Sequence, residues 1–370
     1  MKPATPPIMA RLDAALAASR HPVDAACLRA ERAGLLARQG SLDEASAELQ
    51  TVRRDFAGHP AAVVTVWVCI VEAWIEQYSG RPAVGRDKMR RAQALSAAAR
   101  LKPLQALSAA WLAHLGYMHN DFDDMAKYLT LALQLAAPDH HAARARAALV
   151  AASGYHWANR LDLAQPWYAR AREHAVADAD DALLSIVTFM IACHRCNHVS
   201  RASIFGGVDS AEAHRAQAWL DASVNFDQWV GVAAQDSFVY TLRAQLFSAE
   251  KQHAQALALY EIHLLHAERQ GLAHMRAVYL ADQAWCRFHT GDAVGAHADA
   301  DAAAALIDPG MHVEDLAIAC GRLDQVFEAL GHVDAALRHR QMARAHWATH
   351  QTMMQSMIDL LGRALATEAP

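Results

Sequence analysis

The sequence predicts an all-α fold in which helix pairs follow one another along the chain as a solenoid. Long segments carry apolar residues with the 3.6-residue period of helices, and the alternating β-branched runs typical of strands are nearly absent. A polar or glycine turn also recurs at intervals of 40, 40, 39, 92, 40 and 40 residues. A fixed period of this size is typical of a repeat array rather than of one central core. The turns centre on Gly40, Gly80, Asn120, Asn159, Lys251, Gly291 and Gly331.

Each turn is expected to separate the two helices of one pair. In the segment 148–175, the first helix should end at His156 or Trp157, and Asp162 can cap the second. The interval of 92 residues exceeds two repeats by about twelve residues, so the fifth repeat is expected to carry an insertion near 199–210. Loop insertions in repeat proteins often lie at a binding face, and a tolerated surface insertion is the alternative.

The predicted organisation has three parts. Residues 1–25 form an N-terminal cap segment, residues 26–345 form the solenoid of about eight pairs, and residues 346–370 extend the last helix. Apolar residues in the third part recur at i, i+3, i+4 and i+7, so they form one stripe on a helix. We expect this stripe to fold back and cap the last repeat, the alternative being a dimerisation or connector helix. The stripe consists of Trp347, Met354, Met357, Ile358, Leu361 and Leu365.

The repeats resemble the tetratricopeptide repeat (TPR), most clearly in Gly-Ser-Leu-Asp-Glu-Ala at 40–45 and Asn-Arg-Leu-Asp-Leu-Ala at 159–164. The resemblance covers about residues 26–345 and implies a right-handed superhelix. The period of 40 is longer than the usual spacing of about 34 residues, and it looks like the longer-helix variety in bacterial signalling proteins, such as the sensor region of the maltose-regulon activator. The family's small residue that opens the second helix falls on Ala45, Gly85, Ala164, Ala256, Ala296 and Ala336, and Met125 departs from it.

In this family the first helix of each pair lines a concave groove, and the resemblance implies a set of ligand-facing positions. The set is rich in aromatic residues and histidine and has almost no charge, so it suits an amphipathic helix or an apolar peptide. The alternative is a register error of a few residues, which would place core aromatics in the set. The candidate binding residues are Trp67, Trp74, Gln77, Tyr78, His114, Tyr117, His156, Trp157, Phe189, Asn197, Gln245, Trp285 and Phe288.

Charge and motifs argue against several other functions. The formal net charge of -5 is mild and spread out, which argues against a nucleic-acid or acidic-membrane surface. The N-terminal residues contain no apolar stretch long enough for a signal peptide or membrane anchor. No P-loop, zincin, hydrolase or dinucleotide-binding motif occurs, so an enzyme is not expected. These features predict a cytoplasmic protein.

The six cysteines are scattered through helical segments and are read as free thiols in a reducing compartment. The densest group of soft ligands is residues 193–198, where Cys193 and Cys196 share one helix face while His194 and His198 share another. Because the two pairs point about 100° apart on a helix of 3.6 residues per turn, one helix cannot present all four to a tetrahedral ion. No metal and no cofactor are therefore expected, and a redox-active thiol pair is a minor alternative.

These observations predict a protein-binding module that holds a peptide or a helix of a partner protein in an aromatic groove. The alternative is a ligand-sensing regulatory domain that transmits its state, or dimerises, through the C-terminal helix. A metal- or redox-dependent enzyme centred on residues 193–198 is a third hypothesis.

Overall fold

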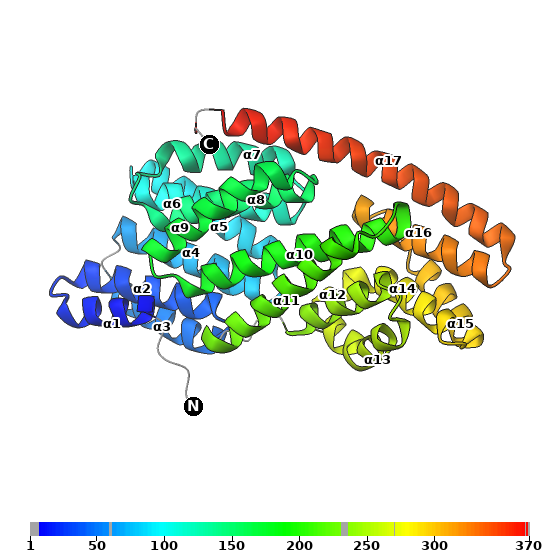
Figure 1. Ribbon diagram of the computed structural model, residues 1–370. Coiled ribbons are helices and arrows are strands. Elements are labelled where there is room, and N and C mark those ends of the chain that lie inside the picture. The colour runs from blue at the N-terminus through cyan, green and yellow to red at the C-terminus, as the bar shows by residue number, and fades with distance from the viewer. Residues whose placement is uncertain (1–6, 59–60, 231–235, 270, 367, 369–370) are drawn as a thin grey trace. The chain divides into compact units, whose positions relative to one another are not determined.

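The computed structural model of the chain describes residues 7–58, 61–230, 236–269, 271–366 and 368, and all regular secondary structure in these residues is helical (Figure 1). The predicted all-α class is therefore confirmed. The first nine helices are α1 (Pro7–Ala18), α2 (Pro22–Arg38), α3 (Leu42–Asp55), α4 (Ala62–Tyr78), α5 (Pro82–Ala98), α6 (Lys102–Met118), α7 (Phe122–Leu135), α8 (His141–Trp157) and α9 (Leu161–Ala177). They are followed by α10 (Asp181–Phe205), α11 (Ser210–Val230), α12 (Asp236–Ala249), α13 (His253–Arg269), the short 3-10 helix η1 (Leu272–Met275), α14 (Arg276–His289), α15 (Ala293–Ala305), α16 (Val313–Ala329) and α17 (Val333–Ala364).

Consecutive helices pack as pairs. The pairs α2 with α3, α4 with α5, α6 with α7, α8 with α9, α12 with α13 and α14 with α15 are each in contact along their lengths. Buried apolar residues join α10 to α11, and Arg340 of α17 forms ion pairs with Asp324 and Glu328 of α16 at 2.9 and 2.8 Å. First helices of neighbouring pairs also contact each other, as α2 does with α4, α6 with α8, and α14 with α16.

All seven predicted turns are confirmed by the backbone. The residue at the centre of each has a positive φ, between 57° and 94°. The residue that follows donates its N–H to a carbonyl five positions earlier, as Ser41 does to Leu36 at 3.0 Å and Arg160 to Tyr155 at 2.8 Å. This hydrogen bond and the left-handed residue define the Schellman motif that ends a helix, which explains why glycine or asparagine recurs at these positions.

The small residues predicted to open the second helices lie where helices touch. Ala45, Ala164, Ala256 and Ala296 are fully buried. A Cβ added to Gly85 would lie 2.8 Å from the carbonyl oxygen of Ala73, on the preceding helix. Such contacts leave no room for a larger side chain, so these positions set how closely the two helices of a pair approach.

The structure corrects the prediction of an inserted loop near residues 199–210. Helix α10 continues to Phe205, and only residues 206–209 connect it to α11. The added turns are held by burial and by a charge pair, since Arg201 Nη1 donates to Glu314 Oε1 at 2.7 Å. Gly321 of α16 makes room for them, because a Cβ there would lie 2.4 Å from Ile204 Cγ2. By length and composition alone α10 could cross a membrane, although 67% of its most apolar stretch is buried inside the structure.

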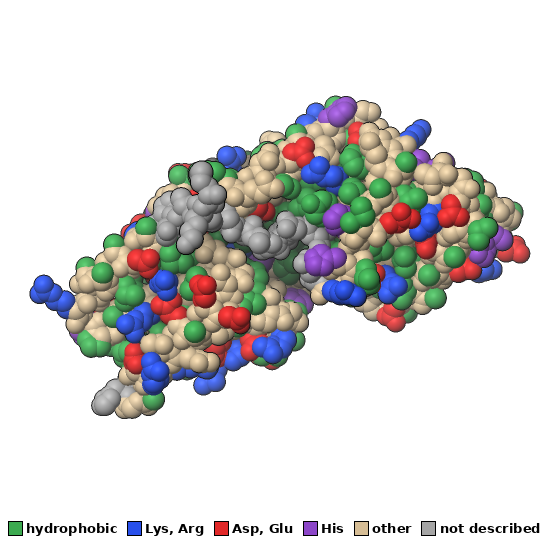
Figure 2. All heavy atoms as spheres, turned by 90° about the horizontal axis from the view of Figure 1, so that it is seen from below, with side chains coloured by type: hydrophobic (Ala, Val, Ile, Leu, Met, Phe, Trp, Pro, Cys, Tyr) green, Lys and Arg blue, Asp and Glu red, His purple; other side chains and the backbone are tan. Residues whose placement is uncertain are grey.

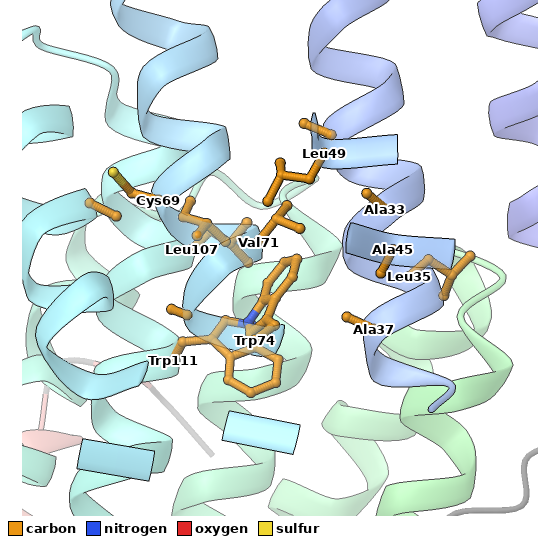
Figure 3. Close-up of a cluster of buried hydrophobic side chains, with 14 of the residues drawn as sticks. Ala33, Leu35, Ala37, Ala45, Leu49, Cys69, Val71, Trp74, Leu107 and Trp111 are labelled. Carbon is orange, nitrogen blue, oxygen red and sulfur yellow. The ribbon is translucent and has the colours of Figure 1, made fainter. Parts of the chain in front are cut away.

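The helices form two compact units. Unit 1 comprises residues 1–187, 226–234 and 357–370, and unit 2 comprises residues 188–225 and 235–356. The core of unit 1 is built around Trp74 of α4, whose ring lies beside Trp111 and faces Ala33 and Ala37 of α2 (Figure 3). The core of unit 2 has two clusters, one around α10 to α12 and one around α13 to α16.

The apolar stripe of the last helix has partners that differ from those expected. Met357 and Leu361 are fully buried in unit 1, where Leu361 Cδ1 would lie 2.9 Å from a Cβ added to Gly154 of α8. These two residues thus cover α8, and not the last helix pair as predicted. Trp347 belongs to unit 2 and stacks on Phe205, with ring centroids 4.4 Å apart.

Candidate binding site

In unit 1, half of the predicted binding residues are core residues. Trp74 and Trp157 are only 4% and 7% exposed, and Trp157 packs against Phe122 with ring centroids 5.2 Å apart. The structure thereby corrects their assignment to an open groove, because each ring fills space between helices. Tyr117 and His156 are buried as well, Trp67, Gln77 and His114 are partly exposed, and Tyr78 is exposed.

In unit 2, the predicted residues divide in the same way. Phe189 and Gln245 are buried, and Phe189 packs against Phe238 at a centroid distance of 5.5 Å. Asn197, Trp285 and Phe288 are partly exposed. Of these, Trp285 lines a pocket, so the structure brings this predicted residue to a concave surface.

This pocket has a volume of about 970 Å³ and is formed within unit 2 alone. The end of α10, the start of α11, the turn between α12 and α13, and one side of α14 and α16 surround it. A volume of several hundred Å³ is typical of sites that enclose a ligand or a side-chain cluster of a partner. The residues that carry its chemistry are Ser203, His214, Lys251, His253, Trp285, His289, Arg322 and Gln325.

A polar network forms the floor of the pocket. Arg322 is 3% exposed, and its guanidinium donates to Ser203 Oγ at 2.8 Å and to Gln325 Oε1 at 2.7 Å. Its Nε lies 2.8 Å from Asp282 Oδ1, and the same carboxylate accepts from Tyr260 at 2.8 Å. A buried charge pair with several hydrogen bonds is costly to disturb, so this network fixes the positions of α10, α14 and α16 around the pocket.

Aromatic and imidazole rings form one wall. The His289 ring lies 4.2 Å from the Trp285 ring in an edge-on arrangement and 4.2 Å from the His253 ring in a stacked one. Burial, together with the neighbouring His289, lowers the pKa of His253 to about 4. His253 is therefore neutral at neutral pH, and the wall offers flat apolar surface with ring nitrogens that can donate or accept hydrogen bonds.

The cysteine–histidine segment 193–198 shows no sign of a reactive thiol. Cys193 and Cys196 are buried and free, and burial raises the pKa of Cys193 to about 12 and that of Cys196 well above its usual value. Thiols in this state are protonated and poor nucleophiles. In the part of the chain that the structure describes, no three His, Cys, Asp or Glu side chains are grouped so that they could hold a metal ion.

One face of the molecule offers little charge selectivity (Figure 2). On the face shown in Figure 2, basic and acidic side chains are interspersed, as expected from the mild net charge of -5.

Comparison with known proteins supplies no relative from which function could be transferred. No protein-family model matches the chain, and no curated protein matches it.

Sequence reasoning missed the arginines that the structure places beside tryptophans. Arg322 lies 5.7 Å from the Trp285 ring in unit 2, and Arg146 lies 4.0 Å from the Trp111 ring in unit 1. The expectation of a groove with almost no charge is thus corrected. Arg146 is a buried residue of α8. Its long side chain extends away from its backbone position, so a repeat register based on small residues does not predict what the guanidinium contacts.

Proposed function

We propose that this protein is a binding module of the TPR type, a solenoid of eight helix pairs that holds a peptide segment of a partner protein in the pocket of unit 2. The observation that carries the proposal is this pocket of about 970 Å³, in which a tryptophan and two histidines face a fixed polar floor. Tryptophan supplies large contact area at low cost in conformational entropy, which is why it is common at the centres of interfaces.

Two further features support the solenoid. The helix pairs follow the 40-residue spacing of the turns, and small residues stand at the helix contacts where TPR repeats have them. Repeat arrays of this kind expose extended concave surfaces and act by recognition instead of chemistry. The pocket is lined by α14 and α16, each the first helix of its pair, and by the end of the longer helix α10. Helix α10 belongs to the repeat that departs from the regular period.

The test is to fill the pocket without disturbing its walls. Gly207 lines the pocket, is exposed, and has nothing within 4 Å of an added Cβ. Gly207→Trp should therefore occupy the pocket and leave the fold intact. Gly58→Trp is the matched control, since Gly58 is also exposed, has nothing within 4 Å, and lies in unit 1.

The measurement is selection of a random peptide library on the wild-type protein, followed by titration of the enriched peptides. We expect peptides with aromatic residues whose dissociation constants rise about tenfold or more with Gly207→Trp, because the central contacts of an interface carry most of its binding energy. Gly58→Trp should leave the constants unchanged. Enriched peptides that bind Gly207→Trp as tightly as wild type would overturn the proposal.

A further inference from the structure

A second polar site, independent of the pocket in unit 2, lies inside unit 1. Its central residue is Arg146 of α8, which is 2% exposed and whose guanidinium carbon lies 4.0 Å from the centroid of the Trp111 ring. The Nη1 atom is buried and has no hydrogen-bond partner among the described residues. Buried arginines are ordinarily paired with a carboxylate, so this side chain is an exception that needs an explanation.

A second arginine lies close by and uses the nearest carboxylate. Arg38 Nη1 donates to Asp180 Oδ2 at 2.6 Å, and the other oxygen of Asp180 accepts the backbone N–H of Leu183 at 3.0 Å. Asp180 is also the carboxylate that acts electrostatically on Arg146. Both oxygens of the Asp180 carboxylate thus already accept a hydrogen bond from another group.

The other groups around Arg146 carry no compensating charge. Burial of the hydroxyl group raises the pKa of Tyr78, and burial of the imidazole lowers the pKa of His114 well below its usual value, although other atoms of both residues reach solvent. Both groups are therefore neutral at neutral pH. Burial also lowers the pKa of Arg146 to about 10, which still leaves the guanidinium protonated. Arg38 is paired with Asp180 and is also acted on by Asp178 and Glu31, whereas Arg146 forms no ion pair with a carboxylate among the described residues.

Further unsatisfied polar atoms lie on α4. Trp74 Nε1, a donor, and Gln77 Oε1, an acceptor, are buried and have no hydrogen-bond partner among the described residues. Trp74 lies beside Trp111 at a centroid distance of 5.2 Å, and the Arg38 guanidinium carbon lies 5.7 Å from the Trp74 ring. Solvent reaches the edge of this region, since Tyr78 is 36% exposed and His114 is partly exposed.

We propose that these residues of unit 1 form a site for a small organic monocarboxylate, whose carboxylate pairs with Arg146 and whose flat body lies against Trp111. A single negative charge matches the unpaired charge of Arg146, whereas a dianion such as phosphate would exceed it. The planar fork of a guanidinium fits a carboxylate in two parallel hydrogen bonds. Because Arg146 is buried, a small acid is favoured over the end of a polypeptide.

The experiment titrates the full chain with benzoate and with its neutral analogue benzamide, using calorimetry and tryptophan fluorescence. We expect benzoate to bind and benzamide not to bind. Arg146→Met should weaken benzoate binding about 10- to 100-fold, as expected for a lost hydrogen bond to a charged group. It should also raise the melting temperature of the ligand-free protein, because it removes an uncompensated buried charge.

Arg170→Met is the matched control, since Arg170 also lies over a tryptophan, 4.6 Å from the Trp167 ring, but is partly exposed. It should leave benzoate binding unchanged. If Arg146→Met does not fold, Arg146→Lys is titrated in its place. This variant keeps the positive charge but loses the planar pairing with a carboxylate, so it should weaken benzoate binding while its circular dichroism spectrum stays helical. Unchanged benzoate affinity in the Arg146 variant that folds, or no binding of benzoate to wild type, would overturn the proposal.

A second arm identifies the source of the carboxylate. The peptide acetyl-Ala-Ala-Phe is titrated with a free carboxyl terminus and with an amidated one. Tighter binding of benzoate than of the free-acid peptide supports a small acid as the ligand. Binding of the free-acid peptide with no response to benzoate would overturn that assignment. None of these readouts depends on the pocket of unit 2, so the two proposals fail or succeed separately.

Discussion

Replacing Gly34 with alanine should destabilise unit 1, because Trp74 occupies the space that the new methyl group needs. An ideal Cβ on Gly34 would lie 2.2 Å from Cζ3 and 2.7 Å from Cε3 of Trp74. Carbon atoms in contact prefer a separation of about 3.5–4.0 Å, so the ring or α2 must move by about 1 Å or more. The ring has little freedom to move, because it is 4% exposed and lies against Trp111.

The magnitude follows from two opposing effects. Overpacking of a tight core costs about 1–3 kcal/mol, and a backbone-mounted methyl against a fixed ring belongs at the upper end of this range. The better helix propensity of alanine offsets about 1 kcal/mol. We therefore expect Gly34→Ala to lower the free energy of unfolding by about 2 kcal/mol.

Urea denaturation followed by circular dichroism measures this change. Gly362→Ala in α17 is the matched control, because nothing lies within 4 Å of its added Cβ, and it should be neutral or slightly stabilising. In a Trp74→Leu background, Gly34→Ala should lose most of its effect, since the ring that it meets is gone. Equal stability of Gly34→Ala and Gly362→Ala would refute the reasoning.

Three further substitutions test a helix contact, a turn and a buried histidine. Ala164→Leu should lower stability by about 1–3 kcal/mol, because Ala164 is fully buried at a helix contact; an unchanged melting temperature would contradict the assigned register. Lys251 has a φ of 65°, so Lys251→Gly should stabilise unit 2 by about 1 kcal/mol, measured as a higher urea midpoint; a lower midpoint would show that the lysine side chain matters more than the strain. His350 is fully buried, and burial lowers its pKa from 6.5 to about 4. Below pH 6.5 this histidine is protonated in the unfolded state but remains neutral in the folded state. The free energy of unfolding therefore has its full value above pH 6.5 and falls by about 3 kcal/mol as the pH drops to 4. His350→Leu should flatten this dependence, and an equally steep profile in the variant would argue against His350 as its source.

The features that the sequence predicts well are those set by local backbone chemistry. A glycine or asparagine between two apolar periodic segments needs no distant partner to end a helix, and all seven predicted turns adopt the left-handed conformation. The positions of the buried small residues that open the second helices are predicted by the same repeat spacing. Even Lys251, which has no intrinsic preference for positive φ, was located by the period of the repeat and not by its residue type.

Features that depend on distant partners were missed. The extension of α10 to Phe205 rests on Arg201 meeting Glu314 and on the space beside Gly321, and no local pattern reports either contact. The register of the TPR resemblance places Trp74 and Trp157 in a groove, but it does not report that Trp74 fills the space beside Gly34 or that Trp157 packs on Phe122. The burial of Arg146 could not be anticipated, because a helical arginine is usually exposed.

The packing of α17 on α8 has a consequence for folding during synthesis. The turn within each helix pair is closed by hydrogen bonds between residues a few positions apart, and the two packed helices are neighbours in the sequence. A pair can therefore form soon after it leaves the ribosome. The face of α8 around Gly154 is different, since Met357 and Leu361 cover it and are made long afterwards. A nascent chain therefore carries an uncovered strip on α8 until α17 emerges. A chain cut short before Met357 would keep its helix pairs but leave this strip open to association with other chains.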